Sequence, residues 1–100
     1  MKVKVSAIHF TVDKKLVQFI EEKVGKLETF YDKIISAEAI LKLEEGASKE
    51  NKVVEIKLNV PGKDLFAKKT SKSFEAAADN VVEALRRQIR KHKTKEMASV

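Results

Sequence analysis

The sequence predicts an α+β fold, a two-layer sandwich with the element order β-α-β-β-β-α. Two kinds of apolar spacing lead to this prediction. Segments in which every second residue is apolar indicate strands, and segments with apolar residues three or four positions apart indicate helices. Short turn sequences that contain Gly, Pro or Ser separate these segments. We expect a four-stranded, mostly antiparallel sheet with both helices on one face.

Three segments alternate as half-buried strands do, namely residues 2–8, 36–44 and 52–60. Glu45 to Ser48 supply a turn between the second and the third segment. Pro61 to Asp64 supply the next turn, and a short fourth strand is expected to begin at Leu65. The residues expected on the buried faces are Val3, Val5, Ala7, Ala37, Ala39, Leu41, Leu43, Val54, Ile56, Leu58 and Val60.

The first helix is expected to follow the first strand. Thr11 or Asp13 can cap it, because either side chain offers an oxygen to the free amides of a first turn. The helical spacing continues to about Phe30. Its expected core stripe is Leu16, Ile20, Val24, Leu27 and Tyr31.

The second helix is expected to begin at Ser71 or Ser73, with Glu75 in its first turn, where a carboxylate suits the helix dipole. It should run to about His92 or Lys95. Its expected core stripe is Phe74, Ala78, Val81, Leu85 and Ile89.

The length and composition indicate one small domain over residues 1–95, followed by a short tail at 96–100. A chain of 100 residues can bury a single core. There is no cysteine, so the sequence offers no disulfide or thiolate metal site, and a cytoplasmic location is expected. No apolar segment is long enough for a membrane span, and we expect no membrane partner.

The residues that would support an enzyme are few. His9 and His92 lie far apart, no histidine pair has metal-ligand spacing, and the three glycines are isolated from one another. We therefore expect no catalytic residue, no metal site, no cofactor and no small-molecule substrate.

The positive charge of the chain is concentrated near its C-terminal end. The formal net charge is +6, and residues 86–95 hold six basic residues and no acid. The other 15 Lys and Arg residues equal the 15 Asp and Glu residues in number. Such a run is either a solubilising surface or a site for a polyanion, and its concentration favours the polyanion.

On a helix, the basic residues of this run share the side opposite Leu85 and Ile89, because each residue advances by about 100°. Like charges at this spacing repel one another, so helix stability alone does not account for them. Phosphate binding does, and the arginine fork suits phosphate oxygens. The residues of this arc are Arg86, Arg87, Arg90 and Lys91, with Lys93 at its edge.

A second stripe on the first helix mixes aromatic and basic residues, namely Phe19, Lys23, Lys26 and Phe30. We expect both phenylalanines to be core residues. The two lysines either lie along the rim of the core or contact nucleic acid. A further basic group, Lys68, Lys69 and Lys72, either adds anion contacts before the second helix or guards an edge strand against pairing.

Three short motifs, together with the element order, resemble the ribosome hibernation-promoting factors. This family also includes the ribosome-associated inhibitors and was once described as sigma-factor modulation proteins. The motifs are KVGKLE at 23–28, VPG at 60–62 before Leu65-Phe66-Ala67, and LRRQIRK at 85–91. The chain departs from the family at 73–75, where SFE replaces the usual Asp-Met-Tyr. Because it lacks the additional C-terminal domain of long members, it resembles a short form.

The resemblance implies binding in the decoding region of the small ribosomal subunit, across the mRNA and tRNA paths. Nothing in the sequence pattern demands more than a monomer, and we expect a monomer off the ribosome. It would silence ribosomes under stress or in stationary phase by steric occupancy, without catalysis. Lys23, Lys26, Arg86, Arg87, Arg90 and Lys91 match basic positions of the family that face ribosomal RNA, whereas Lys93 is included on charge alone.

Two other functions stay open at this point. One is a double-stranded RNA-binding module, although such modules begin with a helix and this chain begins with a strand. The other is a protein-interaction module that acts on a transcription factor.

Overall fold

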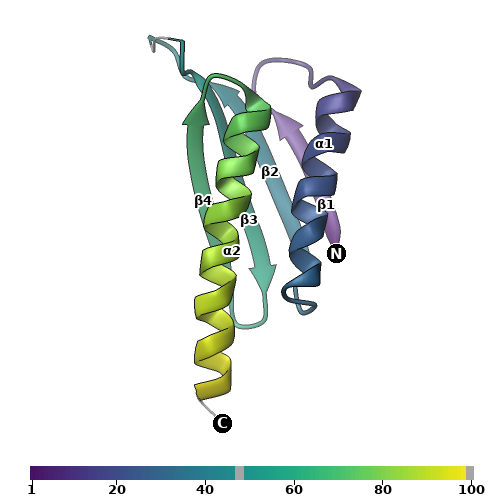
Figure 1. Cartoon of the computed structure of the whole chain (residues 1–100). Helices are drawn as coiled ribbons and strands as arrows, with labels where there is room; N and C mark the ends of the chain where they lie inside the picture. Colours follow the sequence, from purple (N-terminus) through teal and green to yellow (C-terminus); the bar gives the residue numbers. More distant parts are fainter. Residues whose placement is uncertain (47–48, 99–100) are drawn as a thin grey trace.

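A computed structural model describes residues 1–46 and 49–98, with the side chains of 96–98 left out. Figure 1 shows the elements in the predicted order, which is therefore confirmed. They are β1 (Lys2–Ala7), α1 (Lys14–Gly25), the 3-10 helix η1 (Lys26–Thr29), β2 (Ser36–Leu43), β3 (Lys52–Val60), β4 (Lys63–Ser71) and α2 (Phe74–Ala98).

The four strands form one sheet in the order β1-β2-β3-β4. The β2–β3 and β3–β4 pairs are antiparallel, whereas β1 and β2 are parallel. A parallel pair needs a crossover between its strands, and α1 lies in that connection. The expectation of a mostly antiparallel sheet is confirmed.

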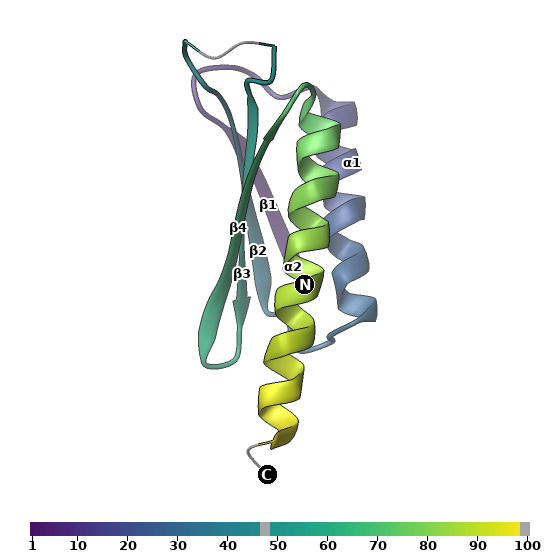
Figure 2. The same ribbon diagram turned by 60° about the vertical axis from the view of Figure 1, so that its left-hand side comes forward.

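Both helices lie on the same face of the sheet, as Figure 2 shows. α1 packs beside β1, and α2 packs over β3 and β4. The core between the layers is made of inward-facing strand residues such as Leu41, Ile56 and Leu58, which are fully buried. Ile20 of α1 and Leu85 of α2 meet them from the helix layer. Burial of these apolar side chains is the main stabilising contribution to the fold.

The first helical segment changes its geometry after Gly25. Asp13 occupies the N-cap position of α1, but its side chain makes no capping hydrogen bond. At Lys26 the α-helix gives way to η1, which has a tighter winding. The predicted helix to about Phe30 therefore exists as two successive pieces, and side chains after Gly25 point in directions that a continuous α-helix would not give them.

The second helix is capped by Ser73, one of the two predicted candidates. Its hydroxyl oxygen accepts a hydrogen bond from the backbone amide of Ala76 at 3.0 Å. The helix runs to Ala98, beyond the predicted end at His92 or Lys95. At 1.5 Å per residue its 25 residues span about 37 Å. Its last turns extend past the end of the sheet (Figure 1), where they are accessible to a large partner.

The fourth strand is longer than predicted. The turn before it contains only Pro61 and Gly62, and the positive φ of Gly62, 87°, suits such a tight turn. β4 then continues through Lys68 and Lys69, which we expected in a loop before α2. The reason is that β4 is an edge strand, whose exposed end can be polar without losing its pairing to β3.

The β2–β3 connection begins where Leu43 ends β2. Leu43 was expected to be buried, but it is 49% exposed, because the hairpin extends past the helix layer (Figure 1). Glu44 donates a backbone hydrogen bond to the carbonyl of Asn51 at 2.9 Å, which closes the hairpin. The expected turn at 45–48 is described only in part, since residues 47 and 48 lie outside the described residues.

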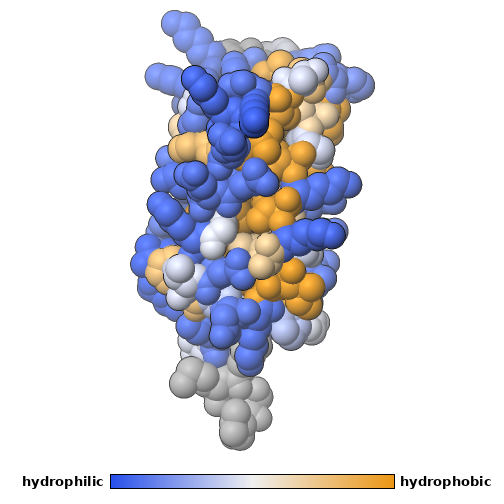
Figure 3. Space-filling model, turned by 90° about the vertical axis from the view of Figure 1, so that its right-hand side faces the viewer, coloured by the Kyte–Doolittle hydropathy of each residue, from blue (hydrophilic) through white to orange (hydrophobic). Residues whose placement is uncertain are grey.

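β1 forms the other edge of the sheet, and its inward-facing residues Val3, Val5 and Ala7 are only partly buried. Figure 3 shows apolar surface running along this side of the molecule between charged side chains. Across the described ranges, 1–46 and 49–98, no helix has the length and apolarity that crossing a bilayer would require.

Candidate nucleic-acid interface

A groove runs between the first helical segment and α2, which lie side by side on the sheet (Figures 1 and 2). Side chains from α1, η1 and α2 line it, so residues about sixty positions apart in the sequence meet there. Five of the seven predicted RNA-binding residues lie along this groove, which we call the cationic groove. They are Lys23, Lys26, Arg86, Arg90 and Lys93.

The end of the cationic groove nearer the start of α2 contains carboxylates as well as cations. The Lys23 ammonium lies 3.2 Å from a carboxylate oxygen of Asp79 and 5.5 Å from the centre of the Phe19 ring. The Arg86 guanidinium lies 3.9 Å from a carboxylate oxygen of Glu83. These pairs are exposed and contribute little stability, but they offset part of the positive charge at this end.

The opposite end of the groove has a different charge balance. Arg86, Arg90 and Lys93 line a hollow there, and none of its described lining residues is an acid. The Lys93 ammonium donates a hydrogen bond to the carbonyl oxygen of Phe30 at 2.7 Å, which holds this side chain across the groove from α2 to the end of η1. Arg90 and Lys93 therefore give this end an excess of positive charge, which the ion pair of Arg86 with Glu83 offsets only in part.

Phe30 lies in this hollow, and its predicted role as a core residue is wrong. It is 41% exposed, and the Arg86 guanidinium lies over its ring, with 4.5 Å from the guanidinium carbon to the ring centre. The switch to η1 explains the error, because it turns Phe30 away from the core. Gly25 was the available signal, since glycine disfavours a continuing α-helix. Phe19, by contrast, packs against the core and is partly buried.

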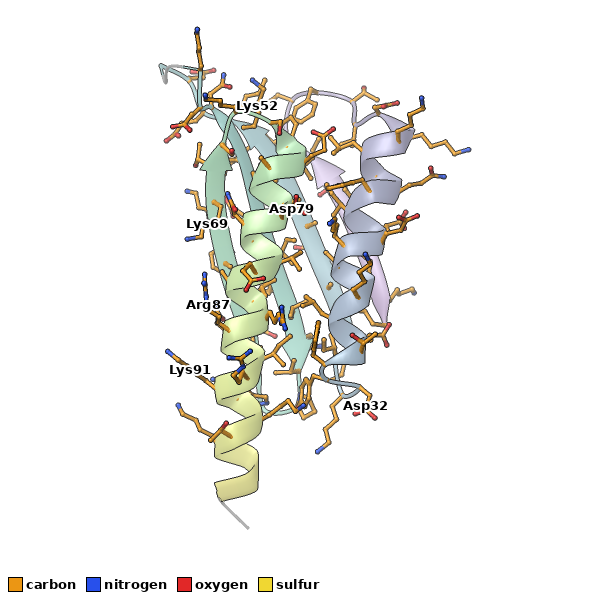
Figure 4. The ribbon with its side chains drawn as sticks, in the orientation of Figure 1. Asp32, Lys52, Lys69, Asp79, Arg87 and Lys91 are labelled. Carbon is orange, nitrogen blue, oxygen red and sulfur yellow. The ribbon has the colours of Figure 1, made fainter. Side chains whose placement is uncertain are left out.

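The other two predicted residues, Arg87 and Lys91, do not join the groove. Figure 4 shows both side chains on the side of α2 that faces away from α1, the same side as Lys69. On the helix surface Arg87 lies three residues from Arg90 and four residues from Lys91, which are the spacings at which helical side chains are neighbours. The residues of the predicted arc thus share one surface of α2, but α1 lies beside only one side of that surface.

The two histidines have structural environments. His92 is buried on α2, and its ring meets that of Tyr31 edge to face, with 5.6 Å between the ring centres. His9 has a positive φ of 66° in the bend after β1. Among the described side chains, which are those of residues 1–46 and 49–95, no group of three from His, Asp and Glu is placed to hold a metal ion.

Comparison with known proteins finds relatives among the ribosome hibernation promoting factors. The chain is 33% identical over 98 residues to a ribosome hibernation promoting factor of Pseudomonas putida, covering 98% of this chain and 92% of that protein. It is 32% identical over 97 residues to the corresponding factor of Azotobacter vinelandii, covering 97% and 87%. A ribosomal subunit interface protein from Coxiella burnetii has the same fold, with a TM-score of 0.82, 20% identity and coverage of 94% and 99%.

The family model described as "Sigma 54 modulation protein / S30EA ribosomal protein" matches residues 3–97, which is nearly the whole chain. This match covers both helices and all four strands, including every residue of the cationic groove. The predicted family is confirmed, and the chain belongs to the Sigma 54 modulation protein / S30EA ribosomal protein family.

Proposed function

We propose that this protein is a ribosome hibernation factor that binds ribosomal RNA of the small subunit through its second helix and inhibits translation. The observation that carries the proposal is the cationic groove, whose end around Phe30 is lined by Arg86, Arg90 and Lys93, with no acid among the described lining residues. Its relatives are hibernation promoting factors, which makes a ribosome the polyanion of first choice.

Binding rests on phosphate contacts. Arginine and lysine side chains release counterions when they neutralise phosphates, which gives affinity for RNA without requiring a particular base sequence. Arg87 and Lys91 on the outer side of α2 extend the phosphate-binding surface beyond the groove. The projecting last turns of the helix allow a large RNA surface to reach both sides.

Inhibition is steric in this proposal. The bound protein occupies the decoding region, where mRNA and the A- and P-site tRNAs would otherwise lie, and no covalent step takes place. Residues 1–95 act as one RNA-binding domain, although α2 itself continues to Ala98. The protein works in the cytoplasm, as a monomer when it is off the ribosome and without a cofactor, during stress or in stationary phase.

Co-sedimentation with small subunits tests the proposal. We expect the protein to travel with small subunits from stationary-phase cells in sucrose gradients at low salt and to be released at high salt. In a cell-free system it should inhibit initiation, and excess tRNA should relieve the inhibition. Retention of a transcription factor without sedimentation on subunits would instead favour a protein-interaction module. Tight binding to any isolated RNA duplex, with no preference for small subunits, would favour a duplex-binding module.

The ion pair between Lys23 and Asp79 gives a further prediction. Asp79→Asn removes the carboxylate beside Lys23 and should strengthen small-subunit binding by up to roughly 4-fold at about 0.15 M salt, because a cation becomes available for phosphate. The dissociation constant, measured over a range of salt concentrations, checks this.

The matched control is Glu21→Gln, which changes the net charge by the same amount on an exposed part of α1 outside the groove. We expect a much smaller gain from it. An equal gain from both variants would mean that total charge, and not the groove, controls affinity.

A further inference from the structure

The hollow around Phe30, at the end of the cationic groove away from the start of α2, combines an apolar floor with a cationic rim. Phe30 and the buried Ile89 supply apolar surface, and Arg86, Arg90 and Lys93 supply charge. Two hydroxyl groups, those of Thr29 and Thr94, complete the lining. Each of them donates a hydrogen bond to a backbone carbonyl, Thr29 to Lys26 at 2.7 Å and Thr94 to Arg90 at 2.9 Å. The lining is thus ordered by contacts within the protein.

Phosphate binding alone does not account for this composition. A phosphate needs cations and donors but gains nothing from an exposed aromatic ring. Leaving Phe30 41% exposed carries a cost in unburied apolar area. A planar, uncharged ring on the ligand would cover that area, and the adjacent cations would then bind an anion attached to the ring.

We infer that this hollow binds one unstacked nucleotide of RNA, with its base against the Phe30–Arg86 pair and its phosphate on Arg90 and Lys93. Aromatic rings and guanidinium planes are the surfaces on which proteins stack splayed-out bases. The Arg86 guanidinium carbon already lies over the Phe30 ring, 4.5 Å from its centre, in a cation–π contact, so the pair forms a preassembled platform. This inference rests on the proposed function, because it requires RNA to reach the groove.

The positions of the acids along the groove favour phosphate binding in this hollow over the adjoining section of the groove. The adjoining section, lined by Lys23, Lys26 and Arg86, also contains Asp79 and Glu83, whose carboxylates would repel a phosphate. Phe30 and Arg86 line both sections, but the hollow that also contains Arg90 and Lys93 has no acid among its described lining residues. A nucleotide therefore has one position of best fit within the described groove.

Two single-stranded RNA oligonucleotides of the same length test the inference, one with bases and one with abasic sites throughout. They carry equal charge, and only one of them has bases that can stack. The wild-type protein should bind the base-containing strand more tightly, by roughly 5- to 100-fold if one base stacks. Phe30→Leu should reduce that ratio to near one, whereas Phe30→Tyr should keep it. Equal affinity of the wild type for the two strands would overturn the inference.

The matched control is Phe66→Leu, the same substitution at another exposed phenylalanine. Phe66 is 51% exposed on β4, and it does not line the groove. Its substitution should leave the ratio unchanged, and thermal unfolding of each variant checks that the protein remains folded. A loss of the ratio in Phe66→Leu as large as that in Phe30→Leu would also contradict the inference.

Small-subunit binding separates this inference from the proposed function. If Phe30→Leu binds small subunits as the wild type does while Arg90→Gln binds more weakly, the groove binds phosphates only and the nucleotide site is wrong. If the wild-type protein does not sediment with small subunits although it prefers bases over abasic sites, the nucleotide site stands and the ribosomal assignment fails.

Discussion

Replacing Arg86 and Arg90 together by alanine is expected to weaken small-subunit binding by roughly 20-fold at about 0.15 M salt. The estimate assumes that each arginine makes one phosphate contact with a log-log salt slope of about −0.8. Both residues line the acid-free hollow, and they come from successive turns of α2. The dissociation constant from sedimentation or fluorescence titration measures the effect.

The same variant should lose little stability. Arg90 is exposed, and an exposed substitution usually changes the free energy of unfolding by less than about 0.5 kcal/mol. Arg86 also loses its contact with Phe30, which is worth about 0.5–1 kcal/mol at an exposed site. The thermal midpoint should therefore fall only slightly. A collapse of the midpoint would make these arginines structural.

Salt dependence distinguishes a local site from diffuse charge. With about five phosphate contacts the slope of log affinity against log salt should be roughly −4, and each groove cation removed should flatten it by somewhat under one unit. Lys49→Ala is the control, because Lys49 is exposed in the β2–β3 connection, away from both helices (Figure 1). Equal flattening by Lys49→Ala and Arg90→Ala would contradict the assigned surface.

The strands and helices could be predicted because their buried residues recur with the period of the backbone in each element. Ala39 and Leu41 face the core together, as do Ile20 and Val24, and each pair follows the period of its element. The polar half of β4 could not be predicted in this way. Its later residues, such as Lys69 and Thr70, are exposed, so no alternation of buried residues marks them as a strand. They are held by pairing to β3, which a local pattern does not contain.

The sequence could predict which charged residues share the polar side of the second helix, but not which of them meet the first helical segment. The helical period placed Arg86 and Arg87 on one polar surface, because both lie away from Leu85. Which of the two residues lines the groove depends on where α1 packs, and a local pattern does not contain that. Arg86 meets Phe30 across the groove, while Arg87 faces the other way (Figure 4). Phe30 was missed for a related reason, since its direction is set by the 3-10 turn that follows Gly25.

The core stripe of α2 holds the cationic residues in place, and Leu85 is its most informative position. Leu85 is fully buried beneath the helix and is the sequence neighbour of Arg86. Leu85→Ala should lower the free energy of unfolding by about 2–5 kcal/mol, because it removes buried methyl groups and leaves a cavity. For a domain of this size that corresponds to a fall in thermal midpoint of at least about 10 °C.

Binding and stability should therefore separate between these neighbouring positions. Well below its lowered midpoint, Leu85→Ala keeps every groove cation and should bind small subunits with nearly wild-type affinity. Arg86→Ala should unfold only slightly below the wild-type midpoint but bind more weakly. Near the midpoint, binding by Leu85→Ala should fail in parallel with its folded fraction, which circular dichroism measures independently. Weak binding by fully folded Leu85→Ala would show that binding depends on the exact positions of the arginines, which the packing of α2 on the sheet sets, and not on surface charge alone.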